Sequence, residues 1–213
     1  MMTMRLILPV ALLATTFLQG CGPLVLAGAG AAVVSFEDRR TTGSQIEDQS
    51  IELRVGNRVD DRFGDKVHCN VTSYNRYVLL TGEVPDEAAR GEIEKIARGV
   101  PNVLGVTNDL QVAGGSSATS RSNDTLITTN VKTRMINSNK FNAIHVKVVT
   151  EAAVVYLLGV VTEQEGADAV ELARTTGGVR KVVKMFEYCK PTDQICLPQP
   201  PSKPAEPRVR SSP

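Results

Sequence analysis

Apolar residues follow the same order twice along the chain. In the segments 46–112 and 123–189, an apolar residue first recurs at every fourth position; two short β-rich runs, a second helix-like stretch and a last β-rich run follow. A shift of 76 or 77 residues places Tyr77–Gly82 on Val154–Gly159 and keeps the other apolar positions in register. Because this match needs only a one-residue gap, the chain contains an internal repeat.

Each copy predicts the element order αββαβ. The first helix is expected to have Asp48 or Asp124 as its N-cap. The second helix should start near Pro85 in the first copy, and at the capping-box pattern of Thr162 and Glu165 in the second. The hairpin strands are predicted at 66–73 with 76–81 in the first copy and at 145–150 with 154–158 in the second. The second helix should end at Gly99 and at Gly177–Gly178, respectively. The last strands are predicted at 103–112 and 179–188.

Two helices on one face of a small sheet can enclose one hydrophobic core per copy. The sequence therefore predicts an α+β protein with two tandem αββαβ domains, each packing two helices on a small three-stranded mixed sheet. They are expected at 46–112 and 123–189, joined by a Gly- and Ser-rich linker at 113–122. The segment 190–213 holds seven of the eleven prolines and few apolar residues, which predicts a disordered tail.

The N-terminal end has the pattern of an export signal. Arg5 precedes a twelve-residue apolar run, which is too short to cross a bilayer because a helical span needs about 20 residues. The residues Leu18–Cys21 resemble the lipobox of bacterial lipoproteins, which implies removal of residues 1–20 and acylation of Cys21. Residues 21–45 then form the acylated cysteine and a flexible tether. Two alternatives stay open, namely an ordinary secreted protein and a tether that forms a short helix in the membrane surface.

Charge and cysteine content narrow the possible functions. Without residues 1–20 the chain has 23 basic and 23 acidic residues, whereas a nucleic-acid-binding domain is expected to be basic, so no nucleic-acid partner is predicted. An exported protein can form disulfides, and Cys189 with Cys196 could close a short loop. Cys69 would then be left over in a strand. No cofactor is expected.

The tandem repeat behind a lipobox resembles the BON-domain family, and in particular the dual BON-domain outer-membrane lipoproteins of Gram-negative bacteria. The resemblance implies a non-enzymatic protein on the periplasmic face of the outer membrane that supports envelope integrity and binds anionic phospholipid through its second copy. Gly22, after the modified cysteine, is similar to lipoproteins released to the outer membrane. The residues that carry the resemblance are Val78-x-Leu80-x-Gly82, Val155-x-Leu157-x-Gly159, the glycine-valine step after each second helix, and Asp38-Arg39-Arg40-x-x-Gly43-x-Gln45.

One departure from the family concerns the hairpins. The family often has a glycine at the start of the second strand, and the corresponding residues here are Arg76 and Ala153. The turn geometry of both hairpins therefore stays open at this point.

The first helix of the second copy differs from its counterpart in charge. No acidic residue lies between Asp124 and Glu151, while this stretch contains Lys132, Arg134, Lys140 and Lys147. At 100° per residue, Leu126 and Ile136 lie on a different face from the core positions, and the first copy is polar at both places. Apolar groups flanked by basic residues suit a helix resting on anionic lipid. The residues expected to contact phospholipid are Leu126, Thr129, Lys132, Thr133, Ile136 and Lys140.

Two alternatives to lipid contact stay open. The same pattern would suit an ordinary solvated helix whose Leu126 packs on the first copy. The protein could also act as an adaptor for outer-membrane assembly or division machinery, with the two copies as docking surfaces for envelope proteins.

Other candidate sites are weak. His68 and His145 occupy matching positions, but no other ligand type accompanies them in the sequence, so a structural role is expected and no metal site is predicted. Asp60 and Asp61 lie on a helix surface without a partner acid. Because no nucleophile with a paired base is evident either, no catalytic residues are assigned and an enzyme is not predicted.

Overall fold

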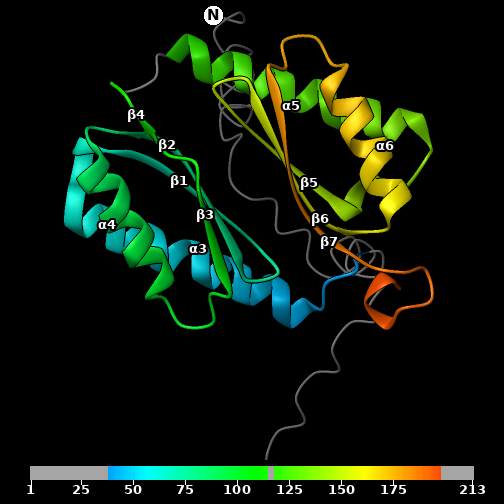
Figure 1. Ribbon diagram of the computed structural model, residues 1–213, viewed down its shortest axis with the longest axis horizontal. Helices are drawn as coiled ribbons and strands as arrows, with labels where there is room; N and C mark the ends of the chain where they lie inside the picture. The colour runs from blue at the N-terminus through cyan, green and yellow to red at the C-terminus, as the bar shows by residue number, and fades with distance from the viewer. Residues whose placement is uncertain (1–37, 115–117, 198–213) are drawn as a thin grey trace, which may run out of the picture. The chain divides into compact units, whose positions relative to one another are not determined.

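The computed structural model describes residues 38–114 and 118–197, in which both copies fold in the order αββαβ (Figure 1). The predicted signal peptide and Cys21 lie outside the described residues. The first repeat consists of α3 (Thr42–Phe63), a 3₁₀ turn η2 (Gly64–Lys66), β1 (His68–Tyr74), β2 (Tyr77–Val84), α4 (Glu87–Arg98), β3 (Gly105–Asn108) and β4 (Gln111–Val112). The second consists of α5 (Ala118–Ser138), η3 (Ala143–His145), β5 (Val146–Glu151), β6 (Val154–Val161), α6 (Glu163–Arg174), β7 (Lys181–Tyr188) and η4 (Gln194–Cys196).

Both sheets are mixed, as the sequence predicted. In the first repeat β1 pairs antiparallel with β2, while β3 and β4 both pair parallel with β2. The break at Asp109 and Leu110 divides the predicted last strand into these two short pieces. In the second repeat β5 pairs antiparallel with β6, and β7 pairs parallel with β6 along its whole length. The α+β class with two helices on a small mixed sheet per repeat is confirmed.

One hydrophobic core lies between the helices and the sheet of each repeat. The helical period places Ile51, Val55 and Val59 on the buried face of α3, where they meet α4 and the inner face of β2. The corresponding core of the second repeat contains residues from α5, α6 and β6, namely Ile127, Val131, Met135, Ala169, Ala173, Val155, Leu157 and Val161.

A third buried cluster lies between the two sheets, on the faces that the helices leave uncovered. Leu79 of β2 lies in it together with Tyr156 and Leu158 of β6. Both faces of β2 and β6 are therefore buried, which explains why Val78–Leu80 of β2 and nearly all of β6 are apolar instead of alternating with polar residues. Polar contacts between the repeats surround this cluster, and they join Asn70 to Glu151, Asn75 to Glu187, Lys147 to Glu52, and Tyr156 to Asp109.

The predicted N-caps of the first helices are wrong. Helix α3 starts six residues before Asp48, because the hydroxyl of Thr41 accepts a hydrogen bond from the backbone N–H of Ser44 and caps the helix there. Helix α5 likewise begins at Ala118 and contains Asp124 in its interior. Both aspartates are buried and have other partners, described below.

Folded structure extends beyond the predicted repeats at both ends. The predicted flexible tether includes Arg39, which is buried, and the start of α3. Helix α5 takes up the end of the predicted linker 113–122. The first part of the predicted disordered tail contains η4, and a disulfide joins Cys189 to Cys196. Residues 198–213 of that tail lie outside the described part of the chain.

Helix α6 also ends earlier than predicted. It starts with the expected capping box of Thr162 and Glu165 and finishes at Arg174, with Thr175 as its C-cap instead of the glycines. Within 38–114 and 118–197, no helix has the length and apolar content that would let it cross a membrane.

Candidate lipid-contact site

Helix α5 has one buried face and one exposed face. Ile127, Val131 and Met135 are almost fully buried in the core of the second repeat. The six residues predicted to contact lipid are all exposed: Leu126, Thr129, Lys132, Thr133 and Ile136 on α5, and Lys140 just after it. Large apolar side chains are normally buried, yet 63% of Leu126 and 62% of Ile136 are accessible to solvent. This exposure argues against the packing of Leu126 on the first repeat, but an ordinary solvated helix is equally compatible with it.

The basic residues of the acid-free stretch mostly have partners in the folded protein. The Nζ atom of Lys140 lies 2.7 Å from a carboxylate oxygen of Asp168, and that of Lys147 lies 3.0 Å from one of Glu52. Arg134 donates hydrogen bonds to the carbonyl of Leu172 and to the hydroxyl groups of Thr175 and Thr176, which follow α6 directly. These acceptors are 28 to 95 residues away in the sequence, so the local charge pattern could not reveal them.

Lys132 differs from these three basic residues. It is exposed, and no acidic group of residues 38–114 or 118–197 forms an ion pair with it. It lies between two hollows of the surface. One, of about 360 Å³, includes Arg121 and Thr129, and the other, of about 500 Å³, includes Ile136 and Ile144. The exposed face of α5 thus combines an unpaired ammonium group with apolar side chains.

The described chain begins beside this face. Asp38 and Arg40 line the same 500 Å³ hollow as Ile136 and Lys132. Sixteen residues separate Asp38 from Cys21, and an extended chain of this length spans at most about 60 Å.

Arg39 fixes this entry point to the second repeat. Its guanidinium group donates to the backbone carbonyls of Cys196, at 2.7 Å, and Val160, at 3.0 Å. It also forms a bidentate ion pair with Glu165, in which Nη1 lies 2.6 Å from Oε2 and Nη2 lies 3.0 Å from Oε1. Burial by itself would raise the pKa of Glu165, but the hydrogen bonds from Arg39 and from the backbone of Thr162 outweigh it and hold this pKa at about 2.

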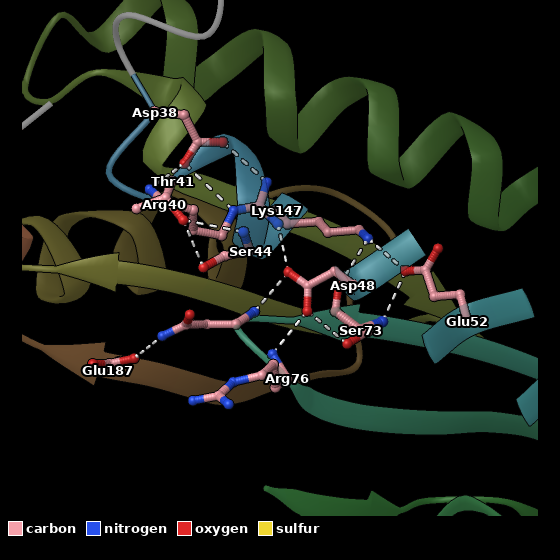
Figure 2. A network of polar contacts seen from close by, with 11 residues as sticks. Asp38, Arg40, Thr41, Ser44, Asp48, Glu52, Ser73, Arg76, Lys147 and Glu187 are labelled. Atoms are coloured by element: carbon pink, nitrogen blue, oxygen red, sulfur yellow. Dashed lines mark hydrogen bonds and ion pairs between the residues drawn. The ribbon is translucent and has the colours of Figure 1, made fainter. Parts of the chain in front are cut away.

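Arg40 fixes the same segment to the first repeat. Its guanidinium group lies 3.0 Å from a carboxylate oxygen of Asp48 and 3.0 Å from one of Asp38 (Figure 2). It also stacks over the ring of Tyr74, 4.1 Å from the ring centroid. Consecutive arginines therefore attach the start of the folded chain to both repeats. Sequence reasoning missed this role, although Arg39 and Arg40 belong to the segment that carried the family resemblance.

Asp48 and Asp124 hold the hairpin turns of their repeats. The carboxylate of Asp48 accepts hydrogen bonds from the backbone N–H groups of Asn75 and Arg76 and from the hydroxyl of Ser73 (Figure 2). Asp124 accepts from the two N–H groups at residues 152 and 153 in the same way. The recurrence of this aspartate in both copies is the sequence signal for this role, although its place near the start of an apolar periodicity favours a helix cap.

Both turns have two-residue loops in which each residue has positive φ, as in a type I′ turn. The angles are 48° and 68° at Asn75 and Arg76, and 48° and 60° at Ala152 and Ala153. Glycine is therefore not required for this geometry here, because a buried carboxylate secures both turn amides. This settles the turn geometry that the sequence left open.

One cluster was not predicted at all. His68 and Glu83 face each other across β1 and β2, and Glu151 approaches them from the end of β5. Their potential ligand atoms all lie within 4.8 Å of one another. The histidine thus has the companions that were missing in the sequence, because the second repeat supplies one of them.

The BON domain model matches residues 47–114 and 123–190, which together make up 136 of the 213 residues. The chain belongs to the BON-domain family. It is 39% identical over 183 residues to the outer membrane lipoprotein DolP of Haemophilus influenzae, which covers 85% of this chain and 95% of that protein. The predicted similarity to dual BON-domain outer-membrane lipoproteins is thereby confirmed.

Two further relatives are more distant. The 21 kDa hemolysin of Actinobacillus pleuropneumoniae is 31% identical over 153 residues, covering 71% of this chain and 79% of that protein. The osmotically-inducible protein Y of Escherichia coli is 31% identical over 144 residues, covering 66% of this chain and 72% of that protein. Relatives that match most of this chain thus have different names, so the family by itself does not define what the exposed face of α5 binds.

Proposed function

We propose that this protein is a lipid-anchored, non-enzymatic component of the outer membrane that binds anionic phospholipids through the exposed face of α5 and thereby supports the integrity of the envelope. The observation that carries the proposal is the exposure of Leu126 and Ile136 on either side of Lys132. An amphipathic surface of this kind lies in the interface between headgroups and acyl chains.

The corresponding helix of the first repeat is less suited to this role. Helix α3 exposes Leu53 and Ile46, so apolar exposure alone does not distinguish the two helices. It contains five acidic and three basic residues, however, whereas α5 contains one acidic residue, the buried Asp124, and three basic ones. The net charges are therefore −2 and +2. An anionic surface attracts α5 and repels α3.

A weak contact is sufficient for an anchored protein. Each basic residue near an anionic surface contributes about 1 kcal/mol, so α5 in isolation should bind vesicles only weakly. An acyl chain on Cys21 would convert this contact into an intramolecular one with an effective concentration of about millimolar. The position of Asp38 beside Ile136 supports this arrangement, because the tether then starts next to the contact face.

Vesicle flotation tests the proposal directly. Residues 22–213, which lack the acylated cysteine, should float with vesicles that contain phosphatidylglycerol and should remain unbound with phosphatidylcholine alone. The double variant Leu126→Asp with Lys132→Glu should lose most of the binding. The matched control is Leu53→Asp with Lys95→Glu, which makes the same changes at exposed positions of the first repeat and should bind normally. Binding that does not depend on anionic lipid, or equal losses in both double variants, would contradict the proposal.

A further inference from the structure

We infer that His68, Glu83 and Glu151 form a binding site for a divalent transition-metal ion, with Zn²⁺ as the best match, at the junction of the two repeats. The carboxyl groups come from both repeats, since Glu83 lies on β2 and Glu151 at the end of β5. The three potential ligand atoms lie within 4.8 Å of one another. Tetrahedral zinc with bonds of about 2.0–2.1 Å places its ligands about 3.3 Å apart, so small side-chain rotations would close the site.

The charge balance of the cluster favours a cation. Glu83 and Glu151 are both 92% buried, and buried carboxylates normally have a positive partner or coordinate a metal. Glu83 has the Nδ1 atom of His68 at 2.8 Å. Glu151 accepts hydrogen bonds only from neutral groups among the described residues, at 2.7 Å from the amide of Asn70 and 3.4 Å from the hydroxyl of Thr81. One imidazole thus faces two carboxylates.

The surroundings leave a route for the ion. His68 and Glu151 line the 360 Å³ hollow beside α5, which is open to solvent. The other charged groups that line it are Arg121, Lys132 and Asp124, and the carboxylate of Asp124 is already used by the hairpin turn. Lys132 reduces the negative potential of the hollow without forming an ion pair with either glutamate. A water molecule could enter from this side as a fourth ligand.

The donor set decides which ion fits. Imidazole nitrogen and carboxylate oxygen are both ligands of Zn²⁺, and its sites with an open position have three protein ligands and a water molecule. Mg²⁺ and Ca²⁺ prefer oxygen ligands throughout, so the histidine disfavours them. Because two ligands belong to the first repeat and one to the second, a bound ion would join the repeats at the polar margin of their interface. It should then stabilise the folded protein as any ligand of the native state does.

Titration of the mature chain in detergent micelles, after treatment with EDTA, tests the site. Isothermal titration with ZnCl₂ should give one ion per chain, and Zn²⁺ should raise the midpoint of thermal unfolding. Glu151→Gln and His68→Gln should each weaken binding by about tenfold or more. Glu187→Gln removes a carboxylate of the same interface that is outside the cluster, and it should bind Zn²⁺ normally.

Co²⁺ gives a second readout that does not depend on stability. It should produce visible absorption bands in the wild-type protein and in Glu187→Gln, and these bands should be lost in His68→Gln. Circular dichroism of each metal-free variant identifies any variant that fails to fold. The Co²⁺ absorption of the variants that do fold then tests whether the cluster binds the metal. The inference is overturned if Zn²⁺ does not bind, if Glu151→Gln binds as tightly as the wild type, or if Ca²⁺ is preferred.

Discussion

Asp48 and Asp124 illustrate how a single residue can be recognised in the sequence and still be misinterpreted. Each lies near the start of an apolar periodicity, where an aspartate normally caps a helix. Each is instead a buried residue inside its helix, and its carboxylate accepts the N–H groups of the hairpin turn. The sequence showed that the position matters, because it recurs in both copies. The partner could not be deduced, since the turn lies 27 to 29 residues further along the chain.

The strain in these turns leads to a test at the scale of one residue. Ala152 has a φ of 48°, a conformation that costs an L-residue about 1–2 kcal/mol, whereas glycine adopts it freely but loses about 0.5–1 kcal/mol in backbone entropy. Ala152→Gly should therefore increase the free energy of unfolding by about 0.5–1 kcal/mol in urea titrations. The same change at Ala167, exposed within α6, should decrease it by about 1 kcal/mol. A decrease in both variants would contradict the positive φ at the turn.

At the scale of elements, the helices and hairpins could be predicted because their signals are local. The capping box of Thr162 and Glu165 and the spacing of Ile127, Val131 and Met135 are all short-range patterns. The links between elements could not be predicted in this way. Lys140 pairs with Asp168, and Lys147 with Glu52, only in the folded chain. A stretch that lacks acidic residues in the sequence can therefore have acidic neighbours in the structure.

The ion pair between Arg39 and Glu165 should make the free energy of unfolding depend on pH. The pKa of Glu165 is about 2 in the folded protein and near 4.5 without these partners. A lowered pKa stabilises the protein above about pH 4.5, and this contribution is lost as the pH falls toward 2. Glu165→Gln should therefore lower the free energy of unfolding by about 3 kcal/mol at neutral pH, because it leaves Arg39 buried without a counter-charge.

The free energy of unfolding should be measured in urea titrations at a series of pH values. Its difference between Glu165→Gln and wild type should shrink steadily below pH 4.5. Glu163→Gln is the control, since Glu163 is exposed in the same first turn of α6. It should show a small difference that hardly changes with pH. If the loss of unfolding free energy in Glu165→Gln stays constant down to pH 2, the contact between Arg39 and Glu165 does not stabilise the protein as an ion pair.

At the scale of the whole molecule, two similar repeats have acquired different surfaces. They share a core between their sheets through Leu79, Tyr156 and Leu158, so neither sheet is available for binding partners on that face. The outer helices remain exposed, and among the helices within 38–114 and 118–197 only α5 combines apolar exposure with a net positive charge. Under the proposed function, this difference between α3 and α5 would direct one side of the molecule to anionic lipid.

Paramagnetic relaxation in NMR spectra tests this asymmetry most directly, because it compares both helices in one sample without mutation. Residues 22–213 would be bound to phosphatidylglycerol nanodiscs that carry a spin label in the lipid headgroup region. We expect strong broadening of the amide signals from Leu126 to Ile136 in α5 and little change from Ser50 to Asp60 in α3. Equal broadening of the two helices, or broadening confined to α3, would contradict it.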